Sequence, residues 1–433
     1  MQAISFSESI VMDATLPRAW QALAMATLAF AANFSVWILY AVLAINIQRE
    51  LNLSGVELGL LLSAPMLSGA ILRIPVGILC EYMGARTLWI WQMLITIPAL
   101  LFLPFVDSYI GFIGIGLWIG LSGVSFTLGV RYVTDWFARS QQGLALGIFG
   151  AGNAGAAISF VLLPLFVIWF DWPWTGPLYA LGLTLMLLVF IIFAPKTPSY
   201  IPRFTPPWRE QLRPLKDPRV WRFSLYYYFV FGSFLALIMW LPHYYMQAYQ
   251  LEFEQAMAFT LFFVTTSSMV RALGGWLADR YGGQLVNWSV FWVCLVCLFF
   301  LSYPPTTMTI HGIDRDVIIN IEINVWVFTA LMFVIGIAQG LGRASVFKVI
   351  HNHYPKQMGS VGGIVAAIGG LGGFTLPILF GLSQDMLGIS SAAFMVLYAV
   401  LAVCMTVMFL ALRAERYRRE LARAQAQNFF EDE

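Results

Sequence analysis

Long apolar runs of about 20 residues alternate with short polar segments along the whole 433-residue chain. Because an α-helix needs about 20 residues to cross roughly 30 Å of hydrocarbon, each run predicts a membrane-spanning helix. Twelve such runs begin near Trp20, Glu57, Thr87, Tyr109, Gln142, Pro177, Phe223, Ala256, Leu285, Val325, Val361 and Ser391. The pattern therefore predicts an all-α membrane protein whose two chain ends lie on the same side of the membrane.

A segment rich in proline and charge separates the first six runs from the last six, which predicts two six-helix bundles joined by a linker. The predicted parts are an N-terminal segment (1–19), the first bundle (20–194), the linker (195–222), the second bundle (223–413) and a tail (414–433) that continues the last helix. On the side opposite the linker, the one sizeable connection is predicted to be a loop over residues 303–322.

Basic residues indicate the orientation, because short cytoplasmic loops of membrane proteins are enriched in Lys and Arg. Of the 24 Lys and Arg residues, only Arg49 and Arg315 fall in loops that alternate to the far side. Both chain ends are therefore predicted to be cytoplasmic, in a multi-pass protein of the cell inner membrane. Hydrophobic residues make up 60% of the chain, and the net charge of +2 is too small to indicate a nucleic-acid partner.

Two arginines interrupt apolar runs at matching positions of the two halves. Arg73 lies in the second run, and Arg271 lies 198 residues later in the eighth. Each is followed by a glycine, a carboxylate and a glycine at offsets of 4, 8 and 11 residues: Gly77, Glu81 and Gly84, and Gly275, Asp279 and Gly282. The repeat indicates an internal duplication. An offset of eight residues is about 12 Å of helix, so carboxylates at the cytoplasmic edge would place both arginines near mid-membrane, nearly facing each other.

Two arginines in the middle of a membrane need a compensating charge. A central arginine costs about 2.5 to 3.5 kcal/mol on insertion scales, and two that approach each other also repel. None of the 22 acidic residues is predicted to lie in the middle of a helix. The missing negative charge favours a site for a small anionic ligand. The alternative that each arginine reaches water or bonds backbone carbonyls remains open.

Glycine-rich stretches in the fifth run, GIFGAGNAGAAIS (147–159), and the eleventh, GGIVAAIGGLGGFTLP (362–377), predict close contacts between neighbouring helices. The glycines assigned to this packing are Gly150, Gly152, Gly155, Gly369, Gly370, Gly372 and Gly373. Asn153 places an amide inside the first stretch, where it must find a partner or cost about 1 to 3 kcal/mol. A bound oxyanion could accept a hydrogen bond from this amide.

Enzymatic and metal sites are not indicated by the sequence. In or near the predicted helices there is no phosphate-binding glycine loop, no pair of inner carboxylates, no serine–histidine arrangement and no metal-ligand spacing. Cys294 and Cys297 lack a second pair or a nearby histidine that would complete a metal site. The chain is therefore predicted not to be an enzyme and to bind no cofactor. An anion channel and a non-transporting sensor remain alternatives to a carrier.

Several motifs resemble those of a known transporter family. GILCEYMGAR and GWLADRYGG resemble the loop motif of the major facilitator superfamily. LRIPVG, VRALGG, AGNAG and AIGGLGGFTLP resemble the nitrate/nitrite porter family, and SYPPTTMTIHGI and GLGRASVFKVIHNHYP resemble its branch of proton-linked nitrate importers. The resemblance runs through essentially all twelve predicted helices. It implies the major facilitator fold and transport of nitrate, and of nitrite, by alternating access.

The resemblance also implies roles for individual residues. Arg73 and Arg271 would hold nitrate by charge-assisted hydrogen bonds, and Asn153 would donate a further one. The family's aromatic positions, which would select a flat ion by shape, are matched by Phe126, Tyr227 and Phe231. The offset of four residues between the last two predicts that they share one face of a helix. For each ring alone, plain packing or contact with lipid remains the alternative.

Charged residues near the predicted cytoplasmic ends are candidates for coupling or gating. They are Glu81, Asp279, Arg280, Arg343, Lys348 and His351. Glu81 and Tyr82 stand where the superfamily motif has Asp and Arg, which predicts a weaker inward gate. Arg343 stands where the closest branch is expected to carry lysine. It keeps the positive charge but cannot release a proton, which argues against titration at this position.

The membrane potential limits the mechanism. Moving one negative charge into a cell at about 100 mV, negative inside, costs about 2.3 kcal/mol. Cotransport with two or more protons would use the potential, whereas exchange of nitrate for internal nitrite is electroneutral and needs no titrating residue. The branch resemblance favours proton symport, and antiport is the alternative. The predicted partners are nitrate or nitrite, protons and the lipid bilayer, and the predicted functional unit is a monomer.

Overall fold

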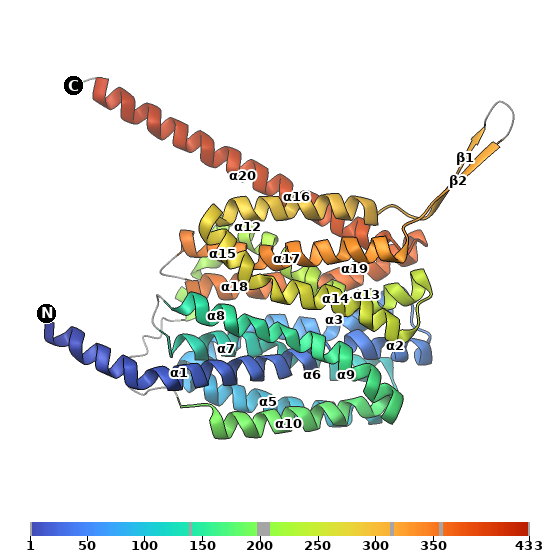
Figure 1. The fold of residues 1–433 in the computed structure, drawn as a ribbon, viewed down its shortest axis with the longest axis horizontal. Coiled ribbons are helices and arrows are strands. Elements are labelled where there is room, and N and C mark those ends of the chain that lie inside the picture. The colour runs from blue at the N-terminus through green and yellow to red at the C-terminus, as the bar shows by residue number, and fades with distance from the viewer. Residues whose placement is uncertain (1, 138–140, 197–207, 312–315, 355–357, 432–433) are drawn as a thin grey trace.

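The computed structural model describes residues 2–137, 141–196, 208–311, 316–354 and 358–431. Within these residues, twelve helical spans are long and apolar enough to cross a membrane, which confirms the predicted number. Each span begins within five residues of its predicted start. The helices lie side by side (Figure 1), as expected of an all-α, multi-pass membrane protein.

The first half of the chain forms six spans, of which four contain or adjoin a short 3-10 turn. Span by span, the elements are α1 (Gln2–Trp37) and α2 (Tyr40–Leu51); α3 (Gly55–Ile71) and α4 (Arg73–Met83); α5 (Ala85–Phe102) and η1 (Leu103–Phe105); α6 (Tyr109–Ile119), η2 (Gly120–Val124) and α7 (Ser125–Thr134); α8 (Gln142–Gly150), η3 (Ala151–Ala154) and α9 (Gly155–Phe170); and η4 (Trp172–Trp174) and α10 (Thr175–Phe193).

The second half repeats this arrangement after two short helices of the linker. In order, the elements are α11 (Trp208–Leu212) and η5 (Arg213–Lys216); α12 (Pro218–Tyr227), η6 (Tyr228–Gly232) and α13 (Ser233–Tyr249); α14 (Phe253–Met269) and α15 (Arg271–Tyr281); α16 (Gly283–Leu301); β1 (Thr306–His311) and β2 (Asp316–Ile321); α17 (Val325–His353); α18 (Met358–Gly370) and α19 (Gly372–Leu387); and α20 (Ala392–Glu431). The residue boundaries proposed for bundles, linker and tail stay predictions.

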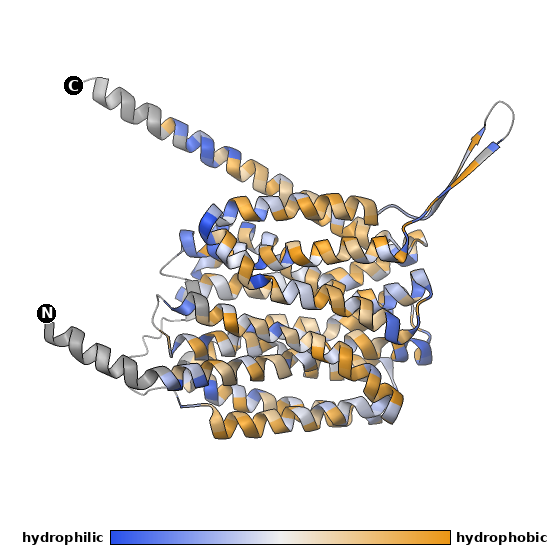
Figure 2. Cartoon of the chain, viewed as in Figure 1, coloured by the Kyte–Doolittle hydropathy of each residue, from blue (hydrophilic) through white to orange (hydrophobic). Residues whose placement is uncertain are grey.

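The two ends of the bundle differ, and Figure 1 distinguishes them. Both chain termini lie at one end, called the termini end, and the strands β1 and β2 project from the other, called the hairpin end. Hydrophilic residues gather at both ends of the spans, whereas apolar residues cover most of their length (Figure 2). The predicted tail forms no separate element in the described residues, since α20 continues through it.

Within residues 303–322, the predicted connection on this side, Thr306–His311 and Asp316–Ile321 form the two strands β1 and β2, which were not predicted. β1 and β2 pair antiparallel, in a register that runs from Thr306 opposite Ile321 to His311 opposite Asp316. Threonine, isoleucine and valine dominate both strands, and β-branched side chains favour the extended backbone. The many β-branched residues of this segment indicate strands, which a pattern of long apolar helical runs does not reveal.

Burial separates central spans from peripheral ones. In the first and seventh spans, 83% and 89% of the apolar window is buried inside the protein, against 33% and 28% in the sixth and twelfth. Large apolar side chains on the latter pair, such as Ile192 and Phe409, are exposed. The first and seventh spans therefore form the centre of the two bundles, and the sixth and twelfth present their side chains to lipid.

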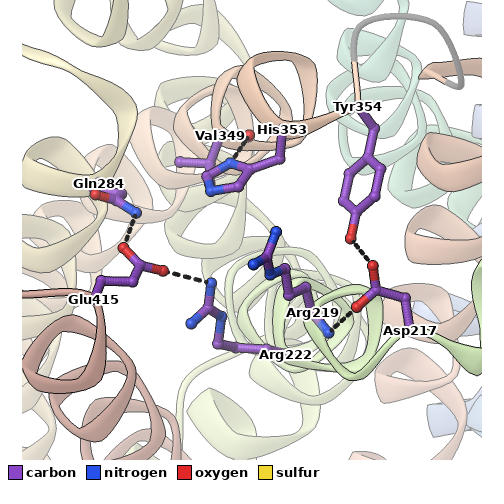
Figure 3. A network of polar contacts seen from close by, with 8 residues as sticks. All are labelled: Asp217, Arg219, Arg222, Gln284, Val349, His353, Tyr354 and Glu415. Atoms are coloured by element: carbon purple, nitrogen blue, oxygen red, sulfur yellow. Dashed lines mark hydrogen bonds and ion pairs between the residues drawn. The ribbon is translucent and has the colours of Figure 1, made fainter. Parts of the chain in front are cut away.

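A polar network at the termini end fastens the start of the seventh span to the tenth and twelfth (Figure 3). The hydroxyl of Tyr354 donates to the carboxylate of Asp217, which also accepts the backbone N–H of Arg219 at 2.9 Å. Arg222 pairs with Glu415 at 3.1 Å. Burial alone would raise the pKa of Asp217, but the hydrogen bonds from Tyr354 and Arg219 and the charges of Arg219 and Arg222 bring that pKa below its ordinary value.

We expect Tyr354→Phe to lower the free energy of unfolding by about 1 kcal/mol, because it removes one hydrogen bond to a carboxylate. The lowered pKa of Asp217 means that this contribution is present above about pH 4 and is lost as the pH falls through the lowered value. Thermal unfolding in detergent between pH 3 and 8 measures the difference. Tyr82→Phe, at an exposed tyrosine, is the control. An equal effect of both variants would contradict the prediction.

Candidate functional site

The two predicted arginines each begin a helix in the middle of a span. The second span is divided just before Arg73, at Leu72, and the eighth just before Arg271, at Val270. Both dividing residues have φ −71° and ψ −11°. The duplication that the sequence predicts therefore extends to the backbone conformation beside each arginine.

Arg73 is a buried cation, 3% exposed, that contacts both halves of the protein. Its Nε donates to the carbonyl of Gly123 in the first half at 3.3 Å, and its Nη1 donates to the carbonyl of Ala366 in the second half at 3.0 Å. Aromatic rings surround the guanidinium, with the Trp37 centroid 5.2 Å and the Phe231 centroid 5.6 Å from Cζ. Bonding to carbonyls, the alternative left open by the sequence, thus accounts for two of its donors.

Arg271 is half-buried, and it shares an aromatic neighbour with Arg73. The Phe126 ring on α7 has its centroid 5.7 Å from Cζ of Arg73 and 5.8 Å from Cζ of Arg271. The two guanidinium groups, from opposite halves, therefore meet at one ring. This agrees with the predicted placement of both arginines at similar depth.

Glycines of the opposite half leave room for each guanidinium. A Cβ placed on Gly150 of the fifth span would lie 3.4 Å from Cζ of Arg271, and one placed on Gly370 of the eleventh would lie 3.4 Å from Nη1 of Arg73. Each arginine thus faces the glycine-rich stretch of the other half. Any side chain larger than alanine at either glycine would enter the space beside a guanidinium.

The other glycines of these stretches contact their own or neighbouring helices. A Cβ on Gly152 or Gly155 would lie within 2.5 Å of an atom of α1. A Cβ on Gly369 would lie 2.4 Å from the Tyr227 ring, and one on Gly372 would lie 2.7 Å from the α-carbon of Gly232 in η6. Gly373 faces Leu235 at 2.9 Å. Close packing, which the sequence predicts for all of these positions, is what these five glycines do in the structure.

Asn153 brings an unpaired amide to the same region. It lies in η3, one turn after Gly150, and its side chain is 1% exposed. Its Nδ2 has no hydrogen-bond partner. An unpaired buried donor costs about 1 to 3 kcal/mol, so this amide favours a ligand that can accept a hydrogen bond. Among the described residues no aspartate or glutamate is fully buried, and no protein anion is therefore placed to fill that role.

The seventh span carries the predicted aromatic pair at a local distortion. Residues Tyr228–Gly232 form a π-helical turn, a feature that often marks functional sites. Tyr227 and Phe231 stack across it with centroids 5.0 Å apart and an angle of 23° between their planes. Their four-residue offset correctly indicates a shared face, and Phe231 also covers Arg73.

Arg343 on α17 is a third buried cation, and it is fully covered. Its Nη2 donates to the hydroxyl of Ser267 at 2.7 Å and to the carbonyl of the same residue, one turn before Arg271. The guanidinium lies over the Phe234 ring, with Cζ 3.9 Å from the centroid. Its Nε and Nη1 have no partner. Arg343 was a candidate from the sequence, but the sequence did not indicate that its side chain would be buried as deeply as that of Arg73.

The remaining candidates for coupling or gating lie away from the arginine pair, at the termini end. Lys348 and Asp279 form an ion pair at 2.5 Å within the second half, and Arg280 lies over the rings of Trp276 and Tyr281. His351 is exposed. Glu81 belongs to α4, but its side chain lies outside the described part of the structure. Across the described residues, no group of three His, Cys, Asp or Glu side chains could hold a metal ion.

Comparison with known proteins agrees with this geometry. The sequence profile of the Major Facilitator Superfamily matches residues 25–319. The chain is 34% identical to the probable nitrate/nitrite antiporter NarK1 of Thermus thermophilus, over 88% of each chain. It is 30% identical to the probable nitrate/nitrite transporter NarK2 of Mycobacterium tuberculosis over 84% of this chain and 89% of that one. It is 27% identical to the nitrite extrusion protein of Bacillus subtilis over 87% and 91%.

A solved structure supports the fold. The crystal structure of a bacterial homologue of the human lysosomal transporter Spinster, inward-facing and occupied, matches with a TM-score of 0.69. The match covers 90% of this chain and 96% of that chain at 15% sequence identity. The superfamily match and the sequence relatives identify this chain as a member of the major facilitator superfamily and, within it, of the nitrate/nitrite porter family.

Proposed function

We propose that this protein carries nitrate, and also nitrite, across the cell inner membrane by alternating access. One observation carries the proposal: an arginine from each half meets at the Phe126 ring, and no fully buried carboxylate among the described residues balances their charge. A small anion that binds between the halves would supply the missing charge. The names of the sequence relatives support nitrate and nitrite as that anion.

The shape of the site suits a flat oxyanion. A guanidinium presents planar N–H donors that match a planar trigonal acceptor, and hydrogen bonds between charged groups are stronger than neutral ones. Asn153 adds an unpaired amide donor. Phe126, Tyr227 and Phe231 would cover the faces of such an ion and exclude water. In this proposal the anion lowers the repulsion between Arg73 and Arg271 and lets the two halves close around it.

The distribution of basic residues supports an orientation with the termini end in the cytoplasm. Most Lys and Arg residues outside the membrane spans belong to connections at that end, as expected of cytoplasmic loops. The hairpin end then faces the outside of the inner membrane. Import means that the anion enters from the hairpin end and leaves at the termini end.

Proton symport is the first proposal for the energy source, because two segments resemble the branch of proton-linked importers and two or more protons would make inward movement electrically favourable. Exchange for internal nitrite is the second. It is supported by the name of the Thermus thermophilus relative and by the absence of a fully buried carboxylate among the described residues. Arg343 cannot release a proton, so this residue cannot carry the proton that symport requires.

Uptake of labelled nitrate into proteoliposomes tests both proposals. With empty vesicles, we expect an imposed inward proton gradient to drive accumulation, and a proton ionophore to abolish it. Uptake that requires trapped nitrite and ignores the gradient would replace symport with exchange. Protein-free vesicles are the control. No saturable uptake under any of these conditions would contradict nitrate transport itself.

A further inference from the structure

The two halves touch backbone to backbone at the hairpin end. A Cβ placed on Gly59 of the second span would lie 2.4 Å from the carbonyl oxygen of Pro377 in the eleventh. One placed on Gly381 would lie 2.0 Å from the carbonyl oxygen of Gly55. These distances leave no room for any side chain at either glycine. The seam between the second and eleventh spans is therefore closed at this end.

Toward the termini end, glycines of the eleventh, eighth and fifth spans meet open space instead. Gly363 lies two turns before Gly370 on the eleventh span, Gly275 one turn after Arg271, and Gly147 one turn before Gly150. A Cβ on Gly363, Gly275 or Gly147 would have no atom within 4 Å. All three share a helix face with a residue of the arginine site. The two halves are thus in close contact between the arginines and the hairpin end, and open space lies beside these three glycines between the arginines and the termini end.

A carboxylate of the second half completes the closed end. Helix α3 starts at Gly55, and the first four N–H groups of a helix have no partner within it. Two of them are paired in a capping box, in which the N–H of Glu57 donates to the Ser54 hydroxyl and the N–H of Ser54 donates to the Glu57 carboxylate. The other two, from Gly55 and Val56, donate to the two carboxylate oxygens of Asp385 at 3.1 and 2.9 Å. Asp385 lies near the end of α19, in the opposite half.

We infer that Asp385 is a positioning residue of the transport cycle, whose carboxylate holds the hairpin end closed by accepting both N–H groups at the start of α3. A negative charge is favourable at the positive end of a helix. Gly55, Gly59 and Gly381 supply the close approach that brings the carboxylate within reach. Opening of the hairpin end must break both hydrogen bonds, so their loss shifts the protein toward the state open at this end. The inference rests on the alternating access of the proposed function but not on the identity of the anion.

Reactivity of a cysteine in the seam measures this shift. Met66 is fully buried, lies on the second span between Gly59 and Arg73, and faces Gly373 of the eleventh. Met66→Cys is therefore protected while the hairpin end is closed. We expect Asp385→Asn and Asp385→Ala to accelerate its modification by a maleimide about tenfold, since charged hydrogen bonds are lost. Asp385→Glu, which keeps the carboxylate, should restore much of the protection.

Two controls separate this effect from general loosening. Gln384→Ala removes the neighbouring side chain, which bonds to Gln247 within its own half, and it should leave Met66→Cys protected. The second control uses the protein without Met66→Cys. Its native cysteines are all buried, so their reaction with the maleimide indicates unfolding; they are Cys80, Cys294, Cys297 and Cys404. The experiment is done in gluconate buffer without nitrate or nitrite, so a failure of the proposed function does not affect it.

The outcomes decide the inference. Protection of Met66→Cys in both the Asn and the Ala variant would overturn it, because packing of the glycines alone would then hold the end closed. Equal acceleration by Gln384→Ala would also overturn it, since any change at the end of α19 would then suffice. Reaction of the native cysteines in the Asn variant would assign Asp385 to the stability of the fold instead. Selective acceleration that Asp385→Glu reverses supports the inference.

Discussion

Arg73→Lys and Arg271→Lys should each weaken nitrate binding about 100-fold, a loss of roughly 3 kcal/mol, while the protein still folds. Lysine keeps the positive charge but replaces a planar set of donors with a point charge that cannot bond two oxygens of one ion in parallel. The effect should be larger for Arg73, because a lysine there must also satisfy the carbonyls of Gly123 and Ala366. Titration of the detergent-solubilised protein with labelled nitrate measures the dissociation constant.

Arg49→Lys is the matched control for these variants. Arg49 is exposed at the end of α2, so the same chemical change is made outside the proposed site. Its dissociation constant for nitrate should equal that of the unmodified protein. Near-normal binding in both Arg73→Lys and Arg271→Lys would exclude the guanidinium pair as the anion site, whatever the uptake experiments show.

The sequence predicted the spans and the arginine pair because both depend on strong local signals. A run of about 20 apolar residues has few stable structures other than a membrane helix. A charged residue inside such a run is conspicuous, and its repetition after 198 residues is unambiguous. The shared face of Tyr227 and Phe231 was likewise predicted from their four-residue offset, whereas their stacking across the π-helical turn was not.

The environment of each arginine could not be predicted, because it depends on the relative position of the two halves. Arg73 and Arg271 occupy equivalent positions of the sequence repeat, but their surroundings differ. Arg73 is buried and donates a hydrogen bond to the other half, whereas Arg271 is half-buried. Asp385 is a similar case. It follows an apolar run, as any helix-end carboxylate does, and only the fold brings it to the start of α3. The full burial of Arg343 also depends on neighbours distant in sequence.

The difference in burial between Arg73 and Arg271 agrees with a structure that is closed at one end. Arg73 lies on the second span, which is pressed against the eleventh from Gly59 to the hairpin end. Its hydrogen bond to Ala366 therefore joins the halves at the level of the site. In a transporter that alternates, such a bond must exchange with bonds to the anion or break when the hairpin end opens. Arg73 would then respond to both the ligand and the state of the gate.

Gly155→Ala should destabilise the protein strongly, by about 1 to 3 kcal/mol or more, whereas Gly147→Ala on the same span should not. A Cβ on Gly155 would lie 2.0 Å from the carbonyl oxygen of Ala31, and a backbone atom cannot move aside as a flexible side chain can. A Cβ on Gly147 meets no atom within 4 Å. Alanine is the better helix former by about 1 kcal/mol, so Gly147→Ala should be neutral or stabilising.

Thermal unfolding followed by tryptophan fluorescence compares the two alanine variants in one experiment. The expected order of melting temperatures puts Gly147→Ala at or above the unmodified protein and Gly155→Ala well below it. Because both substitutions make the same chemical change in one glycine-rich stretch, a difference between them reports the distance to α1 and not the loss of glycine itself. Equal stability of both variants would mean that the fifth span does not approach α1 as closely as 2.0 Å implies, and the packing role of these glycines would then be wrong.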